Sequence, residues 1–293
     1  MSSISIIIVN YNTGDLLIHC LESIRKQNDP SCQVIIVDNA SVDDSIAGLR
    51  SNYSEVQLIA NKSNLGFAAA NNQALGGTSD DLLFFLNPDT ELQPGCLKAV
   101  REFMACHPEV GMAGPAIYNA DGSPHDSMEY SYPGSRYGGR QFDNLPGEIA
   151  WILGAAMIAR REVIEAVQGF DERFFLYAED IDLCLQIRKQ GWPLGFIADA
   201  GVMHIEGQSE KKAPFADVVE RKVHSELLFL NKYYELDVVR KIKRVRLLEA
   251  WWRISCLRIK DVFFGLTVEN RKKLTRYLVV AEVYGQAEGV RNR

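Results

Sequence analysis

Short hydrophobic runs alternate with amphipathic stretches along the first part of the chain. Residues 16–24 carry apolar side chains at a spacing that forms one stripe on a helix. The runs on either side are nearly all apolar, as parallel strands covered on both faces should be. These expected strands are Ile4–Val9, Gln33–Val37, Glu55–Ile59 and Asp81–Leu86. Strands separated by helices predict right-handed βαβ units, and therefore an α/β fold with a mostly parallel sheet flanked by helices.

The pattern changes after the fourth of these strands. From Asn119 to Gly147 the chain is dense in Gly, Pro, Ser and Tyr without periodicity, which is typical of a mobile loop or hairpin. Order returns at Ile149–Ala159, helices are expected at about 161–167 and 179–190, and a strand near Pro193–Ile197. After about Pro214 helix formers dominate. We therefore expect one domain over 1–213, with halves 1–115 and 116–213, and a helical C-terminal region over 214–293.

Composition narrows the class of protein. The chain has 293 residues and is 47% hydrophobic, so it can bury a sizeable core as one large α/β domain with an appendage, or as two small domains. Its net charge of -6 argues against a nucleic-acid binder. Six cysteines without a C-x-x-C pair indicate reduced thiols. The first residues lack the pattern of a signal peptide, and no stretch is apolar enough to span a membrane, so we expect a soluble, cytoplasmic protein.

Polar side chains follow each of the four expected strands. They are Asn10 to Asn12, Asp38 with Asn39, Asn61 to Asn64, and Asn87 with Asp89. Any one of these segments is explained by turn formation alone. Four in succession predict a polar crevice, because ligands of open parallel sheets bind beyond the carboxyl ends of the strands.

Two of these segments suit a nucleotide, although each has a structural alternative. Asp38 can accept hydrogen bonds from a pyrimidine imide or from ribose hydroxyls, or it can cap, with Ser41, a helix beginning near Val42. The run from Asn64 to Asn72, which contains Gly66 and Asn71, opens a helix where a ligand can approach the backbone and a phosphate is favoured. The same small residues would also allow close packing of the helix on the sheet.

Three acids and a histidine are candidates for the chemistry. Asp89, on the turn after the fourth strand, can bind Mg²⁺ or Mn²⁺ that also holds a diphosphate, or it can cap a helix. Glu179 and Asp180 follow an aromatic run, where a general base would lie against an apolar wall, although acids are also favoured in any first helical turn. His204 is either an ordinary core or surface histidine or, near a metal, a ligand.

Other nucleotide-binding motifs are absent from the sequence. The first strand ends in V-N-Y-N rather than in the glycine fingerprint of dinucleotide binders. No G-x-x-x-x-G-K-[ST] occurs anywhere. A nicotinamide dehydrogenase and a P-loop NTPase are therefore disfavoured.

Six motifs occur in the order seen in family 2 inverting glycosyltransferases, and the chain most resembles the rhamnosyltransferase-type branch. The motifs span about residues 4 to 210 and are Ile6–Asn12, Val37–Ser41, Asn64–Asn72, Asn87–Asp89, Gly169–Phe175 and Glu179–Cys184. The resemblance implies a glycosyltransferase A-type fold. Its Rossmann-like half, 1–115, would bind the nucleotide-sugar, and the half 116–213 would bind the acceptor.

The resemblance also implies roles for individual residues. Asp180 matches the catalytic base, with Glu179 beside it. Asp89 and His204 match ligands of a divalent cation, Mg²⁺ or Mn²⁺. Asn87 stands where the strict Asp-x-Asp metal motif has its first Asp, which weakens the expected requirement for metal. The matched nucleotide-sugar contacts are Asn10, Asn12, Asp38, Asn39, Gly66, Asn71 and Asn87.

The expected function is transfer of a sugar with inversion, rhamnose by branch resemblance. The donor would be dTDP-rhamnose or a UDP-sugar, and the acceptor a hydroxyl of a glycan or a lipid-linked molecule in cell-surface polysaccharide synthesis. One alternative is a non-catalytic nucleotide-sugar binding module, which would not need Asp180. Another is a nucleotide-sugar pyrophosphorylase, which would need a Gly-rich, Arg-bearing loop that residues 10–14 do not supply.

The C-terminal region is basic although the whole chain is acidic. Residues 240–276 carry twelve lysines and arginines, interleaved with Trp251, Trp252, Phe263 and Phe264. Three interpretations stay open: a solvated helical face that packs on the catalytic domain, a contact in a homo-oligomer, or a surface that rests on an anionic membrane. In the third case the protein would be peripheral at the inner face of the cell membrane.

Overall fold

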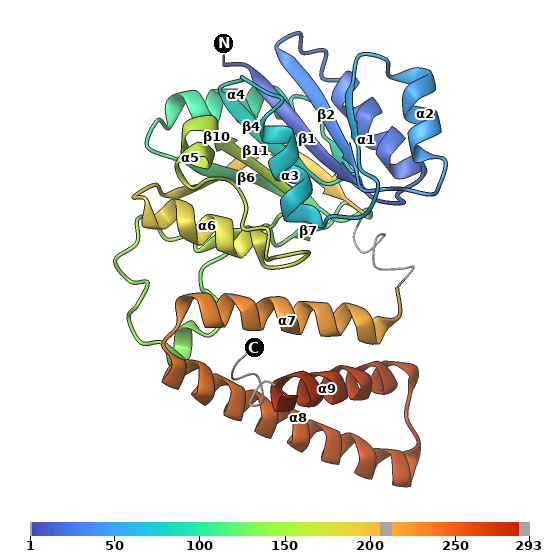
Figure 1. Ribbon diagram of the computed structural model, residues 1–293, viewed down its shortest axis with the longest axis vertical. Coiled ribbons are helices and arrows are strands. Elements are labelled where there is room, and N and C mark those ends of the chain that lie inside the picture. Colours follow the sequence, from blue (N-terminus) through green and yellow to red (C-terminus); the bar gives the residue numbers. More distant parts are fainter. Residues whose placement is uncertain (1, 206–212, 287–293) are drawn as a thin grey trace. The chain divides into compact units, whose positions relative to one another are not determined.

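The computed structural model describes residues 2–205 and 213–286 (Figure 1). It contains two compact units. The first unit runs to Tyr132 and resumes at Asp143. The second unit consists of Pro133–Phe142 and the described residues from 213 onwards.

The centre of the first unit is a mixed sheet of nine strands within the described residues. Their order is β3-β2-β1-β4-β10-β6-β11-β5, with β7 paired to β6. The strands are β1 (Ile4–Asn10), β2 (Cys32–Asp38), β3 (Gln57–Ala60), β4 (Leu82–Leu86), β5 (Thr90–Leu92), β6 (Met112–Tyr118), β7 (Pro124–His125), β10 (Ala156–Arg160) and β11 (Leu194–His204).

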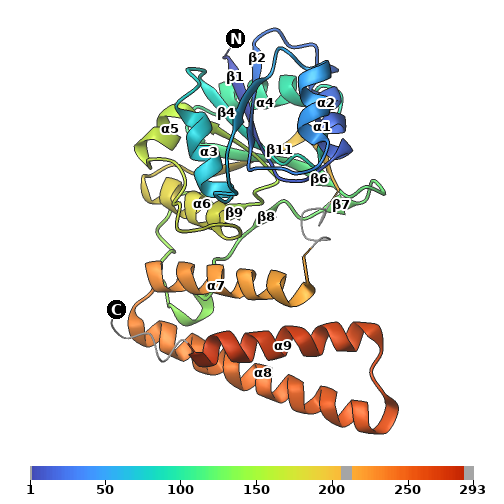
Figure 2. The ribbon, with the colours of Figure 1, turned by 45° about the vertical axis from the view of Figure 1, so that its right-hand side comes forward.

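Helices cover both faces of this sheet (Figure 2). One face is covered by α1 (Asp15–Arg25), α2 (Ser45–Asn52) and α4 (Cys96–Cys106). The other is covered by α3 (Phe67–Leu75), α5 (Arg161–Ala166) and α6 (Glu179–Lys189). Successive residues of β1 enter opposite cores, because side chains alternate along a strand: Ile6 and Ile8 face the first set of helices, Ile7 and Val9 the second. This two-sided burial confirms the reading of the apolar runs and the α/β fold class.

The second half of the sheet departs from the sequence-based expectations. β10 runs antiparallel between β4 and β6, so the sheet is mixed rather than a simple parallel one. The strand expected near Pro193–Ile197 is only the start of β11, whose pairing with β6 shifts between Ile197 and Gly201 and then continues to His204. β5, β6 and α4 had no counterpart among the expected elements. Gly114 and Pro115 inside β6 weaken its strand pattern.

The segment from Asn119 to Gly147 divides between the two units. β7 folds back on β6, which matches the hairpin alternative, and β8 (Met128–Glu129) pairs with β9 (Trp151–Ile152). Residues 133–142, with the short 3-10 helix η1 (Ser135–Tyr137), belong to the second unit. There the hydroxyl of Tyr234 donates a hydrogen bond of 2.8 Å to the carbonyl oxygen of Pro133.

Three helices form the rest of the second unit. They are α7 (Phe215–Tyr233), α8 (Leu236–Phe264) and α9 (Val268–Gln286). Their shared core contains Val223 and Leu227 of α7, Ile254 of α8, and Ala281 and Tyr284 of α9. None of the helices among the described residues is long and apolar enough to cross a membrane. The helical C-terminal extension expected from composition is confirmed.

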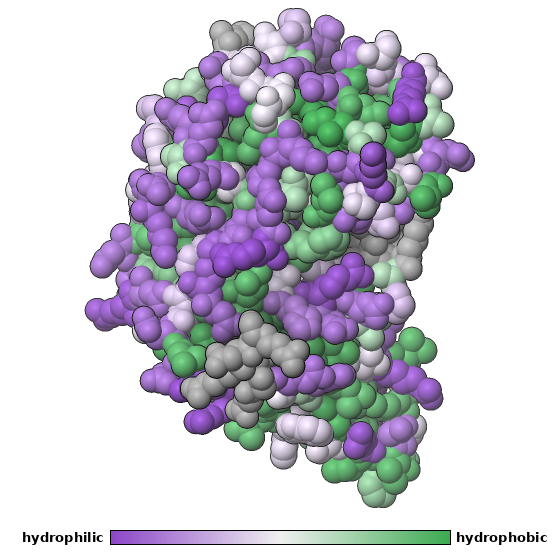
Figure 3. Space-filling model, in the orientation of Figure 1, coloured by the Kyte–Doolittle hydropathy of each residue, from purple (hydrophilic) through white to green (hydrophobic). Residues whose placement is uncertain are grey.

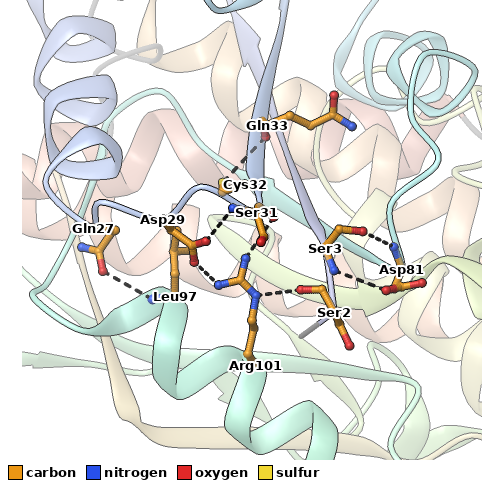
Figure 4. Close-up of polar contacts among 10 residues, drawn as sticks. All are labelled: Ser2, Ser3, Gln27, Asp29, Ser31, Cys32, Gln33, Asp81, Leu97 and Arg101. Carbon is orange, nitrogen blue, oxygen red and sulfur yellow. Dashed lines mark hydrogen bonds and ion pairs between the residues drawn. The ribbon is translucent and has the colours of Figure 1, made fainter.

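The amino-terminal edge of the sheet is closed by one partly buried arginine (Figure 4). Arg101 of α4 donates to the carbonyl oxygens of Ser2 and Ser31, at 2.7 and 3.0 Å, and pairs with Asp29. These bonds satisfy backbone groups that precede β1 and β2. The opposite, carboxyl-terminal edge is where the polar segments of the sequence lie.

Candidate active site

The predicted site residues are gathered at one edge of the sheet. β1, β2 and β4 are parallel neighbours, so Asn10, Asp38 and Asn87 all lie at their carboxyl ends. β10 begins at this edge, and β11 ends there with His204 opposite Thr90. Residues separated by almost two hundred positions are thereby brought to one side of the first unit. Their roles stay predictions, whereas their placement is a finding.

A buried hydrogen-bond network links the first two strand ends. The side-chain amide of Asn10 donates to Asp38 Oδ1 at 2.8 Å and to Ser41 Oγ at 3.0 Å, and Asp38 Oδ2 accepts the Ser41 N–H at 3.1 Å. Helix α2 begins only at Ser45, with Asp44 at its N-cap. Asp38 therefore does not cap a helix. It is held as a fixed, buried acceptor at the strand end.

The next two asparagines shape the loop over this network. Asn12 has a left-handed backbone (φ 56°), its N–H donates to Ser41 Oγ, and its Oδ1 accepts the N–H of Val42. The side-chain amide of Asn39 donates to the carbonyl oxygen of Gly66 at 3.1 Å. Asn39 Oδ1 accepts a hydrogen bond of 2.9 Å from the side-chain amide of Asn61. The second strand end is thus tied to the loop that opens α3.

Gly66 is required by a close approach of two backbones. Its φ is +89°, and a Cβ there would lie 2.5 Å from the carbonyl oxygen of Phe175, which accepts the Phe67 N–H at 2.7 Å. Close packing is therefore the observed reason for this glycine, but against Phe175 rather than against the sheet. One turn later, Asn71 Oδ1 is buried without a hydrogen-bond partner among the described residues. Such an atom indicates a missing polar partner.

Asp89 and His204 form a buried pair. Asp89 Oδ1 lies 3.4 Å from His204 Nε2, and the Asp89 carbonyl oxygen accepts the Ile205 N–H at 2.9 Å. Asp89 precedes strand β5, so the helix-cap alternative is wrong. Within residues 2–205 and 213–286 no cluster of three or more His, Cys, Asp or Glu could hold a metal. Two protein ligands still fit Mg²⁺ or Mn²⁺, because these ions take further oxygens from water and from substrate phosphates.

The acidic pair begins helix α6 after a strained turn. Tyr177 and Ala178 both have left-handed backbones, with φ of 72° and 64°, a conformation that costs energy for residues other than glycine. Asp180 Oδ2 accepts the Gly154 N–H at 2.9 Å, and Oδ1 accepts the Ile181 N–H at 2.8 Å. The acids do lie in a first helical turn, as the macrodipole alternative requires, but they are buried rather than solvated.

Two adjacent residues, Gly154 and Ala155, connect the acidic pair with the turn that carries Asp89. Gly154 donates its N–H to Asp180, and the carbonyl oxygen of the following residue, Ala155, accepts the Asn87 N–H at 2.9 Å. Asn87 begins the turn that carries Asp89. Asp180 and Asp89 are therefore held by the same short loop between β9 and β10.

Burial shifts the ionisation of both acids. Loss of water raises the pKa of Asp180, although the N–H groups of Gly154 and Ile181 oppose this shift. Burial together with the charge of Asp180 raises the pKa of Glu179 well above its ordinary value, and Glu179 Oε2 has no hydrogen-bond partner among the described residues. Of the two acids, Glu179 therefore holds its proton more strongly. Asp180, bound by two N–H groups, is the carboxylate, and its raised pKa makes it a stronger base.

A pocket of about 370 Å³ opens beside this loop. It is lined by residues 124–129 together with Trp151 and Leu153. Leu153 directly precedes Gly154, and its N–H donates to the carbonyl oxygen of Ser127 at 3.0 Å. The pocket therefore lies beside the Gly154 N–H group that binds Asp180, because Leu153 in its wall directly precedes Gly154.

Comparison with known families decides the class of this site. Residues 5–168, more than half of the chain, match the family model described as Glycosyl transferase family 2. The chain belongs to glycosyl transferase family 2. It is a glycosyltransferase, as the ordered motifs predicted.

Curated relatives place the chain nearer one branch of the family. The N-acetylglucosaminyl-diphospho-decaprenol L-rhamnosyltransferase of Mycobacterium tuberculosis is 28% identical over 279 residues, which cover 85% of this chain and 86% of the relative. The O-antigen chain rhamnosyltransferase WbaN of Salmonella anatum is 24% identical, covering 70% of this chain and 66% of the relative. The resemblance to rhamnosyltransferases is therefore confirmed.

Solved structures confirm the fold class. The mannosyltransferase PcManGT from Pyrobaculum calidifontis, in complex with GDP-Man and Mn²⁺, superposes with a TM-score of 0.63 at 16% identity, covering 98% of this chain and 88% of that chain. TarS 1-349 of S. aureus, in complex with UDP-GlcNAc, gives a TM-score of 0.54 at 16% identity and covers 99% and 93%. The glycosyltransferase A-type architecture expected from the motifs is thus observed.

Sequence reasoning missed the residues that position the site. Gly154 and Ala155 carry the connecting hydrogen bonds through their backbones, which have no side-chain signature. Phe175 likewise acts through its carbonyl oxygen. A glycine between two short apolar runs, as at Gly154, is the one signal that could have indicated a close approach.

Ionisation of Glu179 should oppose folding, so we predict that Glu179→Gln stabilises the protein at high pH. Because the pKa of Glu179 is raised in the folded state, its contribution to stability is complete below its ordinary pKa of 4.5 and is lost as the pH rises through the raised value. The variant should melt at least about 2–4 °C above the wild type near pH 8, the shift given by about 1 kcal/mol, and the gap should close near pH 4.

Melting curves recorded across this pH range provide the test. Glu162→Gln, an exposed glutamate on α5, is the matched control and should melt with the wild type at every pH. Two results would contradict a raised pKa of Glu179 in the folded protein. One is a Glu179→Gln variant that is less stable than the wild type at pH 8, and the other is a melting temperature that differs from the wild type by the same amount at every pH.

Proposed function

We propose that this glycosyltransferase moves a hexose, rhamnose in the first instance, from a nucleoside diphosphate to a hydroxyl with inversion. The acceptor would be a glycan or a lipid-linked molecule in cell-surface polysaccharide synthesis. Two relatives named as rhamnosyltransferases support the sugar, and the diphospho-decaprenol in the name of one supports a lipid-linked acceptor. The observation that carries the proposal is the Gly154–Ala155 loop, which holds a buried carboxylate base and the metal turn together.

The donor would lie along the carboxyl edge of β1, β2 and β4. Asp38, fixed by Asn10, would accept hydrogen bonds from the base or ribose of dTDP-rhamnose or a UDP-sugar. Asn12 and Asn39 hold the loop beside it, and Gly66 lets that loop pack closely against Phe175. Asn71 Oδ1, buried without a partner among the described residues, would accept a hydrogen bond from the nucleotide-sugar.

A divalent cation fits the same edge. Asp89 and His204 would hold it, with Asn87 at the start of the turn. When bound, the ion would neutralise charge on the diphosphate. The Mn²⁺ and GDP-Man in the PcManGT complex support this assignment by similarity of fold.

Asp180 would act as the general base. Its carboxylate takes the proton of the acceptor hydroxyl while that oxygen forms a bond to the anomeric carbon and the bond to the diphosphate oxygen breaks. A single displacement inverts the anomeric centre and needs no covalent enzyme intermediate. When Glu179 is protonated, it adds no second negative charge beside the base. The acceptor would enter through the pocket lined by Trp151 and residues 124–129.

A lipid-linked acceptor would place the reaction at a membrane. We therefore propose that the protein is cytoplasmic and peripheral at the inner face of the cell membrane. The basic segment 240–276 supports this location through its charge.

Replacing the base should abolish turnover without abolishing donor binding. Asp180→Asn should lose about 10²–10⁴-fold in kcat, because the amide cannot accept the proton, and should bind dTDP- and UDP-sugars as the wild type does. Initial rates with a thermal-shift titration of donor measure both effects. Asp182→Asn makes the same change at another buried acid of α6 and should retain turnover. Wild-type turnover in Asp180→Asn, or an equal loss in Asp182→Asn, would exclude Asp180 as the base.

The metal assignment predicts a coupling between Mn²⁺ and nucleotide that does not depend on catalysis. Mn²⁺ should tighten the binding of UDP or dTDP to the wild type at least about tenfold, because an ion held by Asp89 and His204 would neutralise charge on the diphosphate. Asp89→Asn should lose this coupling. Glu91→Gln, two residues away on β5, should retain it. Calorimetric titrations with and without Mn²⁺ give the result, and equal coupling in wild type and Asp89→Asn would remove Asp89 from the ion site.

A further inference from the structure

Helix α8 carries apolar side chains on two faces. One face is buried in the core of the second unit through Ile242, Ala250 and Ile254. A second set of large apolar side chains is exposed to solvent. Its members, with exposed fractions of 55–81%, are Leu248, Trp251, Trp252, Ile259, Val262 and Phe263. We call these six residues the outer face of α8.

The outer face is continuous and lies opposite the packed face. Leu248, Trp252, Ile259 and Phe263 follow one another at intervals of four, seven and four residues, which keeps them on one side of a helix. Ala250 and Ile254 lie about half a turn away. Phe264, the last residue of α8, and Val268, the first residue of α9, are also exposed, at 84% and 75%, on either side of the turn at Gly265. Figure 3 shows hydrophobic surface gathered at the end of the second unit where α8 and α9 are joined.

Basic side chains border this apolar surface. Arg253, Arg258 and Lys260 are exposed on α8, and among the described residues neither arginine has an acidic partner. Residues 240–276 carry twelve lysines and arginines against three acids, in a chain whose net charge is -6. Exposed tryptophans and phenylalanines beside unpaired cations are the combination that favours the boundary between lipid headgroups and acyl chains.

We propose that the outer face of α8 binds the surface of an anionic bilayer. Trp251, Trp252 and Phe263 enter the headgroup boundary, and the flanking cations contact lipid phosphates. A second copy of the chain is a poorer occupant, because it would bring two strongly basic segments together. This proposal assigns the peripheral location given under the proposed function to particular residues. It rests on the proposed function only for the biological purpose of membrane binding, because lipid binding itself needs neither donor nor acceptor.

Vesicle co-sedimentation tests the proposal with the full-length protein. Vesicles of phosphatidylcholine alone are compared with vesicles that also contain phosphatidylglycerol. The wild type should bind the anionic vesicles at least about tenfold more tightly, and added salt should weaken this binding. Trp fluorescence should shift to the blue on binding, and Trp251→Phe/Trp252→Phe, which keeps Trp151 and Trp192, should lose most of the shift.

Paired variants separate the apolar and the charged contributions. Trp252→Ala/Phe263→Ala should weaken binding at least about tenfold, because insertion scales with buried apolar area. Arg258→Gln/Lys260→Gln should weaken it about fivefold for each charge removed. Both pairs are exposed, so neither change should alter the melting temperature. The controls are Phe215→Ala, an exposed aromatic of α7, and Lys26→Gln/Arg50→Gln, two exposed cations of the first unit, and they should bind as the wild type does.

The outcomes distinguish this inference from the proposed function. Absence of vesicle binding in a protein that still transfers sugar to a detergent-solubilised acceptor would overturn the inference alone. Vesicle binding that depends on the outer face would support it even in a protein without transferase activity. Equal binding by the Trp252→Ala/Phe263→Ala variant would overturn it. The inference would also be overturned if light scattering showed that the wild type is a dimer which the Trp252→Ala/Phe263→Ala substitutions dissociate, and if the wild type did not bind vesicles.

Discussion

The backbone groups of two neighbouring residues, Gly154 and Ala155, hold the candidate active site together. The N–H of Gly154 binds Asp180, and the carbonyl oxygen of Ala155 binds the backbone of Asn87 at the start of the turn that carries Asp89. This arrangement depends on β10 running antiparallel between β4 and β6, because only then does the loop before β10 meet the carboxyl end of β4. Asp180, the proposed base from the second half of the first unit, is thereby connected to the proposed nucleotide edge that the first half builds.

The same edge leaves buried polar atoms unsatisfied. Asn71 Oδ1, Glu179 Oε2 and His204 Nδ1 have no hydrogen-bond partners among the described residues, although buried polar groups are otherwise almost always paired. Tyr177 and Ala178 add backbone strain beside them. The apolar packing on both faces of the sheet offsets these free-energy costs. In this account a bound substrate supplies the missing partners, which connects the instability of the site with its function.

The sequence predicted the parts of this design that have strong local signals. The apolar runs of β1, β2 and β4 are buried on both faces, so their pattern is unambiguous, and the polar residues that follow them lie at one edge because parallel strands share their direction. The antiparallel β10, the glycine- and proline-containing β6 and the division of residues 119–147 between two units depend on long-range pairing, which local patterns do not encode. The outer face of α8 was visible in the sequence only as aromatic and basic residues. Its separation from the packed face required the helix.

Amide hydrogen exchange with and without a dTDP- or UDP-sugar and Mn²⁺ tests most directly whether these residues form one site. If they do, four separated segments should be protected simultaneously, namely residues 38–42, 64–68, 86–90 and 153–155. Residues 29–33, at the opposite edge closed by Arg101, should exchange at an unchanged rate. Protection confined to the first two segments, with residues 86–90 and 153–155 unaffected, would contradict a shared site for nucleotide, metal turn and base.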